Sequence, residues 1–277
     1  MSKKCKNTQF DPRGQQGSQI TTLTYDFPDG YVIPEHFHDQ DQLVYACRGV
    51  MTVVAAEGTW VVPAQRAVWI PARTPHGIRM SGIVFMRTLY LKPSLLRSLP
   101  RNCSVVNVSP LLKELILHAC EFTDLSKRVR IQAHLIHVIV DLIEGVEAVP
   151  LQLPNPRDPR ALRVAKALLA DPGDQRPLEE ICKTVGGSKR TIERLFQVET
   201  HMTFGKWRQQ LRLMQGLRLL AGGEKVTNAA LESGYNSPSA FISMFRSALG
   251  TTPSRYFDDA IAAPKAANAG SSPRGKI

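Results

Sequence analysis

The feature that most constrains this chain is a pattern that occurs twice in its C-terminal half. Each copy has a short helical segment, a glycine-containing turn and a serine that can cap the helix after it. Ser188 and Ser237 occupy the capping position and lie 49 residues apart. Serine is a favoured N-cap residue and glycine suits the turn that ends a helix. The predicted helices span 177–185, 189–199, 204–220, 226–233 and 238–249. Together they form two tandem helix-turn-helix units joined by one long helix.

The positive charge is concentrated in the same half. Residues 1–156 carry a net charge of +3, whereas residues 157–277 carry +8. A basic helical domain is suited to the phosphate backbone of a nucleic acid. Two recognition helices on a rigid connector would enter major-groove segments ~34 Å apart on one face of DNA.

The N-terminal half has the pattern of an antiparallel β-structure. Between Ile20 and Leu91, short apolar runs alternate with turn residues, which favours a sandwich or small barrel. Ser109 and Pro110 begin a helical region. Its second helix carries an apolar stripe that either covers the barrel or forms a dimer seam: Ile131, Leu135, Val138, Ile139 and Leu142. The predicted fold class is α+β, with an N-terminal antiparallel β-barrel flanked by helices and a C-terminal all-α domain.

Four prolines between Pro150 and Pro159 predict a stiff linker between the two domains. The predicted organisation is a flexible arm at 1–18, a sensing and dimerisation domain at 19–149, the linker at 150–159, a DNA-binding domain at 160–258 and a disordered tail at 259–277.

Two cellular settings are excluded by the residues. The apolar stretch around 135–146 contains His137, Asp141 and Glu144, so it does not predict a transmembrane helix. The N-terminus lacks the apolar segment of a secretory signal. The five cysteines are dispersed without a CxxC pair, which favours a reducing compartment. We expect a cytoplasmic protein without a membrane partner.

The C-terminal half resembles a known family. Residues 234–256 read Gly-Tyr-Asn-Ser-Pro-Ser-Ala-Phe-Ile-Ser-Met-Phe-Arg-Ser-Ala-Leu-Gly-Thr-Thr-Pro-Ser-Arg-Tyr, which is similar to the signature of AraC/XylS-type transcription regulators. Residues 188–200 and 207–213 match its upstream part. The resemblance implies a bacterial regulator that binds double-stranded promoter DNA, dimerises through its N-terminal domain and activates through RNA polymerase.

The resemblance also places the DNA contacts. The implied base-reading residues are Arg190, Glu193, Arg194 and Gln197 in the first unit, and Ser239, Ala240, Ile242 and Ser243 in the second. The candidate phosphate contacts are Ser188, Lys189, Lys206, Arg208, Ser237 and Arg246. Arginine can donate to guanine and glutamate can accept from cytosine, so the first unit is predicted to supply most of the base readout. Gly216 is predicted to loosen the connecting helix.

Three histidines in the N-terminal half resemble the metal ligands of a cupin barrel. His36 and His38 fall in Gly30-x5-His36-x-His38-x3-Gln42-x6-Gly49, and His76 follows Pro71-x4. Gln42 replaces the glutamate ligand of the cupin motif, and Arg73 replaces a glycine. The histidines therefore either hold a divalent metal such as zinc, nickel or iron, or line a metal-free effector pocket as a relic of such a site.

Three functions fit these features to different degrees. The leading prediction is a transcription regulator whose N-terminal cupin-like domain senses an unidentified small-molecule or metal effector. The alternatives are a cupin enzyme fused to a DNA-binding domain and a nonspecific architectural DNA-binding protein. An enzyme needs a full metal ligand set, and Gln42 is a poor ligand. We therefore predict that the protein is not an enzyme and has no catalytic residues.

Overall fold

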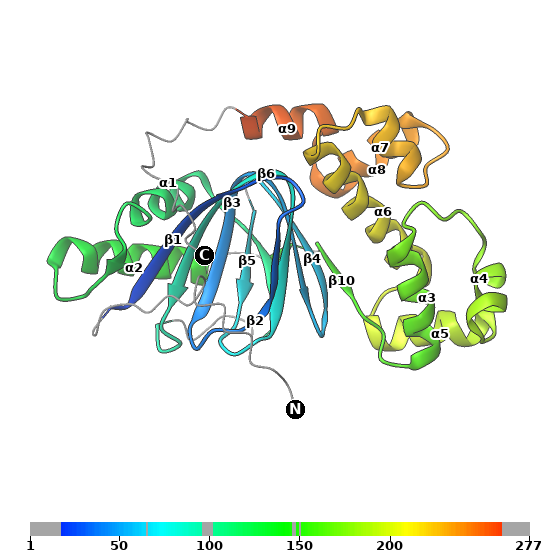
Figure 1. Ribbon diagram of the computed structural model, residues 1–277, viewed down its shortest axis with the longest axis horizontal. Helices are drawn as coiled ribbons and strands as arrows, with labels where there is room; N and C mark the ends of the chain where they lie inside the picture. Colours follow the sequence, from blue (N-terminus) through cyan, green and yellow to red (C-terminus); the bar gives the residue numbers. More distant parts are fainter. Residues whose placement is uncertain (1–17, 65, 96–101, 146–147, 150, 262–277) are drawn as a thin grey trace, which may run out of the picture.

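The computed structural model describes residues 18–64, 66–95, 102–145, 148–149 and 151–261. Most of the predicted N-terminal arm and C-terminal tail therefore lies outside the described residues. The N-terminal half forms one antiparallel sheet (Figure 1). Its strands are β1 (Ile20–Phe27), β2 (Val32–His36), β3 (Asp41–Ala55), β4 (Gly58–Pro63), β5 (Arg66–Ile70), β6 (His76–Leu91), β7 (Ser104–Asn107), β8 (Asp124–Leu125), β9 (Ala148–Val149) and β10 (Gln152–Pro154).

Two long strands, β3 and β6, form the centre of the sheet. The apolar runs on either side of Gly49 belong to one strand, because Gly49 lies within β3 rather than in a turn. Gly49 has a φ of +77°, and a Cβ there would lie 2.6 Å from the carbonyl oxygen of Ile83 on β6. The register of β3 against β6 shifts on either side of Arg48. A glycine bulge thus bends the strand pair without ending it.

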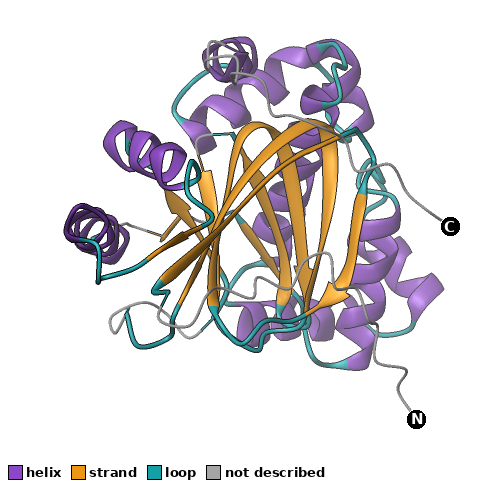
Figure 2. Ribbon diagram, turned by 60° about the vertical axis from the view of Figure 1, so that its left-hand side comes forward, coloured by secondary structure: helices purple, strands orange, loops and turns teal. Residues whose placement is uncertain are grey.

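The sheet is curved but does not close into the predicted barrel. Its ladder runs β8-β1-β6-β3-β5-β7-β9, with β2, β4 and β10 attached at the side. Within the described residues, the two ends of this ladder are two-residue strands that do not pair with each other. The predicted antiparallel sheet with flanking helices is confirmed, whereas the prediction that the sheet closes into a barrel is wrong (Figure 2).

Two helices cover one end of the sheet. They are α1 (Pro110–Ala119) and α2 (Arg130–Glu144). The Ser109 hydroxyl caps α1 by accepting a hydrogen bond from the Leu112 N–H. Ile116, Ile136 and Ile139 are fully buried against the sheet. In contrast, Ile131 is 75% exposed and Val138 is 43% exposed, so α2 also carries an uncovered apolar face.

The C-terminal half is helical. It comprises α3 (Pro159–Ala170), α4 (Leu178–Val185), α5 (Lys189–Thr200), α6 (Phe204–Ala221), α7 (Val226–Glu232), α8 (Pro238–Leu249) and α9 (Pro253–Ile261). The α4–α5 and α7–α8 pairs lie near opposite ends of α6 (Figure 1). The prediction of two helix-turn-helix units on a long helix is confirmed. No helix of the described residues is both long and apolar enough to cross a membrane.

The segment predicted as a linker takes part in the sheet. Residues 152–154 form β10, whose register pairs Leu153 with Thr59 of β4. The Nε1 of Trp207 on α6 donates a hydrogen bond to the carbonyl oxygen of Pro154 at 2.9 Å. The segment therefore connects the sheet to α6 as well as joining the two halves of the chain.

The long helix α6 packs against the sheet. It contacts β3, β4, β6 and β10, while α9 contacts β3. Gly82 of β6 has a φ of +71° and lies against the carbonyl group of Ala221, where a Cβ would clash. Buried apolar side chains from both halves form one continuous cluster. The connector of the two helix-turn-helix units is thus held on the N-terminal sheet.

Candidate nucleic-acid interface and metal centre

The first recognition helix, α5, separates an apolar face from a charged one. The Ser188 hydroxyl accepts a hydrogen bond from the Thr191 N–H and begins the helix. Ile192 and Phe196 are fully buried, and the Phe196 ring contacts Trp207 of α6 at a centroid distance of 5.2 Å. All four predicted base-reading side chains are exposed: Arg190, Glu193, Arg194 and Gln197.

The second recognition helix, α8, has the same construction and a different outer face. The Ser237 hydroxyl accepts a hydrogen bond from the Ala240 N–H, and Phe241 and Phe245 are fully buried. Three predicted base-reading residues are exposed and one is partly buried: Ser239, Ala240 and Ser243 are exposed, and Ile242 is intermediate. These four residues offer hydroxyls and apolar groups but no charge, whereas Arg246, one turn after Ser243, is an exposed cation of the same helix.

Gly216 is where α8 contacts α6. A Cβ at this position would lie 2.5 Å from Cε2 of Phe241. The glycine therefore makes room for the aromatic ring that anchors the second unit. The expectation that Gly216 loosens the connector is wrong, because the missing side chain lets α8 pack closely on α6.

The predicted phosphate contacts are differently placed. Lys206 and Arg246 are exposed, and Lys189 forms a 2.6 Å ion pair with Glu179 of α4. Arg208 is partly buried and donates to two backbone carbonyl groups, those of Arg176 at 2.7 Å and of Asp174. These bonds hold the α3–α4 loop against α6. The sequence pattern showed the positive charge of Arg208 but not that backbone groups engage it.

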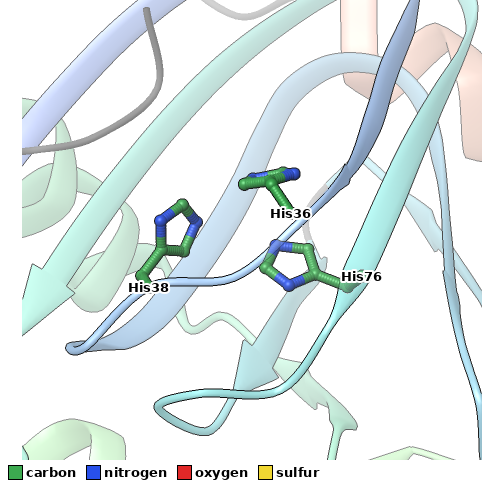
Figure 3. A group of neighbouring side chains, drawn as sticks. All are labelled: His36, His38 and His76. Carbon is green, nitrogen blue, oxygen red and sulfur yellow. The ribbon is translucent and has the colours of Figure 1, made fainter. Parts of the chain in front are cut away.

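The three predicted metal ligands come together at one end of the sheet (Figure 3). His36 ends β2 and His76 begins β6, where the two residues are direct partners in the strand register. His38 lies in the segment after β2. One ligand atom from each ring lies within 4.8 Å of the others. Such a cluster has the nitrogen donors and the compactness that a transition metal needs.

Two loops are tied together around this cluster. The Arg73 N–H donates to the carbonyl oxygen of His38 at 2.6 Å, and its guanidinium pairs with Asp39 at 3.1 Å. The carboxylate of Asp41 accepts from the Ala72 N–H at 2.8 Å. Arg73 has a φ of +63°, the left-handed conformation that favours glycine, which is the cupin residue at this position. The loop that bears His38 is therefore fixed next to the loop before His76.

Backbone carbonyl groups fix the orientation of two of the rings. The Nδ1 of His36 lies 2.8 Å from the carbonyl oxygen of Pro34, and that of His76 lies 2.8 Å from the carbonyl oxygen of Thr74. A carbonyl oxygen only accepts, so Nδ1 carries the proton in both rings and Nε2 keeps its lone pair. The Nε2 of His76 is buried without a hydrogen-bond partner among the described residues.

Burial favours the neutral form of His36 and His76. It lowers the pKa of His76 to about 4, partly opposed by the hydrogen bond to Thr74, and it also lowers the pKa of His36. Neutral imidazole is the form that binds a metal. Gln42 is buried on β3 opposite Tyr90, whose ring contacts His38 at 4.9 Å. The Nε2 of Gln42 donates a hydrogen bond to the Thr88 hydroxyl at 3.3 Å. The Oε1 of Gln42 is buried without a hydrogen-bond partner among the described residues. The compact donor cluster consists of the three histidines.

Comparison with known proteins agrees with this architecture. The AraC-like ligand binding domain matches residues 19–181, and a helix-turn-helix domain matches residues 181–259. The chain belongs to the AraC family of transcriptional regulators. The family prediction made from residues 188–200, 207–213 and 234–256 is confirmed, and the match extends it to the N-terminal half.

Several relatives of this AraC-family regulator are known. It is 30% identical over 247 residues to the HTH-type transcriptional regulator NimR of Escherichia coli. This alignment covers 89% of this chain and 90% of NimR. It is 36% identical over 104 residues to the regulator RipA of Corynebacterium glutamicum, covering 38% of this chain and 31% of RipA. A solved structure of ToxT from Vibrio cholerae matches 87% of this chain and 98% of that chain, with 12% identity and a TM-score of 0.38.

Family membership settles the class of activity. The protein is a transcriptional regulator with an N-terminal ligand-binding domain and a C-terminal helix-turn-helix domain that binds DNA. Its family and relatives are regulators rather than enzymes, which confirms the predicted class over the cupin enzyme.

Proposed function

We propose that the regulator binds promoter DNA sequence-specifically and that α5 supplies most of the base readout. The exposed row of Arg190, Glu193, Arg194 and Gln197 carries this proposal. Arginine and glutamate on a major-groove helix distinguish guanine and cytosine. The uncharged base-reading positions of α8 are suited to thymine methyl groups, backbone contacts and DNA shape. Lys206 and Arg246 remain the exposed cations proposed to contact phosphate.

A competition experiment tests sequence-specific binding. The full chain first selects DNA from a random-sequence pool, and the selected site is then competed against unselected DNA at one fixed salt concentration. We expect the selected site to bind at least ~10³-fold more tightly, as specific regulators do. Equal binding of both DNAs would contradict the proposal and favour the architectural protein.

We further propose that His36, His38 and His76 hold a divalent metal: zinc, nickel or iron. The buried, unpartnered Nε2 of His76 supports this proposal, together with the carbonyl groups that orient two of the rings. Three neutral ligands leave a coordination position open for a further donor. The metal, or a small molecule bound to it, would then be the effector that shifts promoter binding.

The metal content of the purified, untagged protein tests this site. Elemental mass spectrometry should find about one equivalent of metal in the wild type and none in the His36→Ala/His38→Ala variant. His134→Ala/His137→Ala is the matched control, because it removes two histidines from α2. Metal-free wild-type protein, even after incubation with zinc, nickel and iron, would leave the histidines as the lining of a metal-free pocket.

We propose that the regulator acts as a homodimer in the cytoplasm and activates transcription through RNA polymerase. The exposed apolar face of α2, with Ile131 and Val138, supports dimerisation, because an uncovered apolar patch marks an interface. Sedimentation of the Ile131→Asp/Val138→Asp variant tests it. We expect a dimer for the wild type and a monomer for the variant. A variant that remains a dimer would show that the interface does not lie on this face of α2.

A further inference from the structure

The two helix-turn-helix units meet in a backbone contact beside α6. Residues 171–177 form the loop from α3 into the first unit, and Gly234 lies in the turn between α7 and α8 of the second. A Cβ on Gly173 would lie 2.8 Å from the carbonyl oxygen of Glu232, and one on Gly234 would lie 2.9 Å from the carbonyl oxygen of Gly173. The loop and the turn are therefore closer than two side chains would allow.

Arg212 of α6 contacts both sides of this meeting point. Its Nη2 donates a hydrogen bond to the carbonyl oxygen of Asp174 at 3.0 Å, on the side of the first unit. Its guanidinium carbon lies 5.8 Å from the centre of the Tyr235 ring, on the side of the second unit. The same guanidinium packs against Gly234, where a Cβ would lie 3.0 Å from both Nε and Nη2. Arg212 thus joins the two units to each other and to the helix that connects them.

Each group that Arg212 contacts is itself anchored in its own unit. The buried carboxylate of Asp174 pairs with Arg176 at 2.7 Å, and Arg208 donates to the backbone carbonyl groups of both residues. On the other side, the Tyr235 ring contacts that of Phe241 at a centroid distance of 5.5 Å. Phe241 is the buried residue that holds α8 on α6. A continuous chain of contacts therefore runs from the loop before α4, through Arg212, to α8.

We propose that Arg212 is a positioning residue that fixes the angle between the two recognition helices, and with it the spacing of the two DNA segments that the regulator accepts. A guanidinium can donate in its plane while an aromatic ring lies against its face, so one side chain serves both units. Each base pair inserted between two DNA segments turns them by about 35° and separates them by about 3.4 Å. Helices held at one angle therefore accept one spacing. This inference rests on the proposed sequence-specific binding.

DNA sites with altered spacing test the role of Arg212. The full-length wild type first selects its site from random DNA, and one or two base pairs are then inserted between the two conserved segments. Binding is titrated at one fixed salt concentration for the wild type and Arg212→Met, which keeps an unbranched side chain. We expect one inserted base pair to weaken wild-type binding at least ~tenfold and Arg212→Met binding less than ~threefold. A merely structural role would lower affinity for every spacing alike.

Arg208→Met is the matched control. It removes the same charge from the same helix, and the two hydrogen bonds that it loses both reach the loop of the first unit. We expect it to keep the spacing preference of the wild type. An equal relaxation in Arg208→Met would show that a loosened loop, rather than the bridge between the units, changes the spacing, and would overturn the proposal.

Gly173→Ala tests the same contact without touching Arg212. Its added Cβ meets the Glu232 carbonyl oxygen, so the loop and the turn must move apart. We expect it to flatten the spacing preference or to shift it by one base pair. This variant carries the test if Arg212→Met fails to fold, which circular dichroism and thermal unfolding establish.

The outcomes separate this inference from the proposed function. Wild-type protein that binds selected and unselected DNA equally would overturn sequence-specific binding, and the inference with it. A specific wild type whose site has one conserved segment would overturn the inference alone. So would an unchanged spacing preference in folded Arg212→Met, or in Gly173→Ala where that variant carries the test.

Discussion

The two recognition helices share an interior and differ at the surface. Both α5 and α8 begin at a serine whose hydroxyl caps the helix, and both are anchored to α6 by a buried phenylalanine. Phe196 packs against Trp207, whereas Phe241 packs against the bare backbone of Gly216. Three of the four base-reading positions of α5 are charged, whereas the four base-reading positions of α8 are uncharged. The comparison teaches that the structural unit is repeated while its readout chemistry is not.

The largest expected effect tests the shared interior. Phe196→Ala and Phe241→Ala should each lower the free energy of unfolding by ~3–5 kcal/mol, because each leaves a cavity beside α6. Chemical denaturation measures both. Val198→Ala, at a position that is 60% exposed on α5, is the control and should change little. A loss of stability in only one of the two variants would show that the buried cores of the two units are not equivalent.

The next effect tests the difference at the surface. Arg194→Ala should cost ~1–3 kcal/mol of DNA binding and relax the preference at one base position, because a guanidinium that contacts guanine is lost. Selection from random DNA, followed by titration of the selected site, measures both quantities. Arg130→Ala on α2 is a control of equal charge outside the helix-turn-helix units. An unchanged base preference in Arg194→Ala would exclude this residue from readout.

A smaller effect tests the matching helix starts. Ser188→Ala and Ser237→Ala should each lower the free energy of unfolding by ~1 kcal/mol, because each removes the acceptor for a backbone N–H. Ser188→Asp and Ser237→Asp should restore stability, since aspartate also caps helices. A loss with alanine that aspartate fails to restore would argue against capping.

The smallest effect sharpens the comparison from the other side. Ser243→Ala should change DNA affinity by less than ~0.5 kcal/mol, because the uncharged base-reading positions of α8 offer few direct base contacts. The same titration measures it beside Arg194→Ala. A loss as large as that of Arg194→Ala would make the second unit an equal reader of bases.

Local features of this protein could be predicted from its sequence, and distant pairings could not. The caps at Ser109, Ser188 and Ser237 follow from neighbouring residues, and the structure confirms them. The open sheet depends on which strands pair over long distances, and an apolar run carries no information about its partner. A glycine also looks the same in a turn and in a bulge, so the sequence does not show that β3 continues through Gly49.

The same distinction applies to the site residues. The resemblance and the spacing identified the three histidines that cluster and the exposed row on α5. They did not identify the carbonyl groups that engage Arg208, nor the ring of Phe241 beside Gly216. A sequence shows which residues are charged and which are glycines. Which group binds the charge or packs against the glycine depends on the tertiary fold.

The pairing of β10 with β4 has a practical consequence for anyone who divides this protein. A cut within the proline-rich segment before residue 152 would remove the partner of β4 and leave its edge bare. Exposed strand edges recruit other chains and promote aggregation. The N-terminal half should therefore be expressed through Pro154 at least, and the helical half then lacks the carbonyl group that Trp207 uses as an acceptor. Neither half can be isolated with all of its native hydrogen bonds.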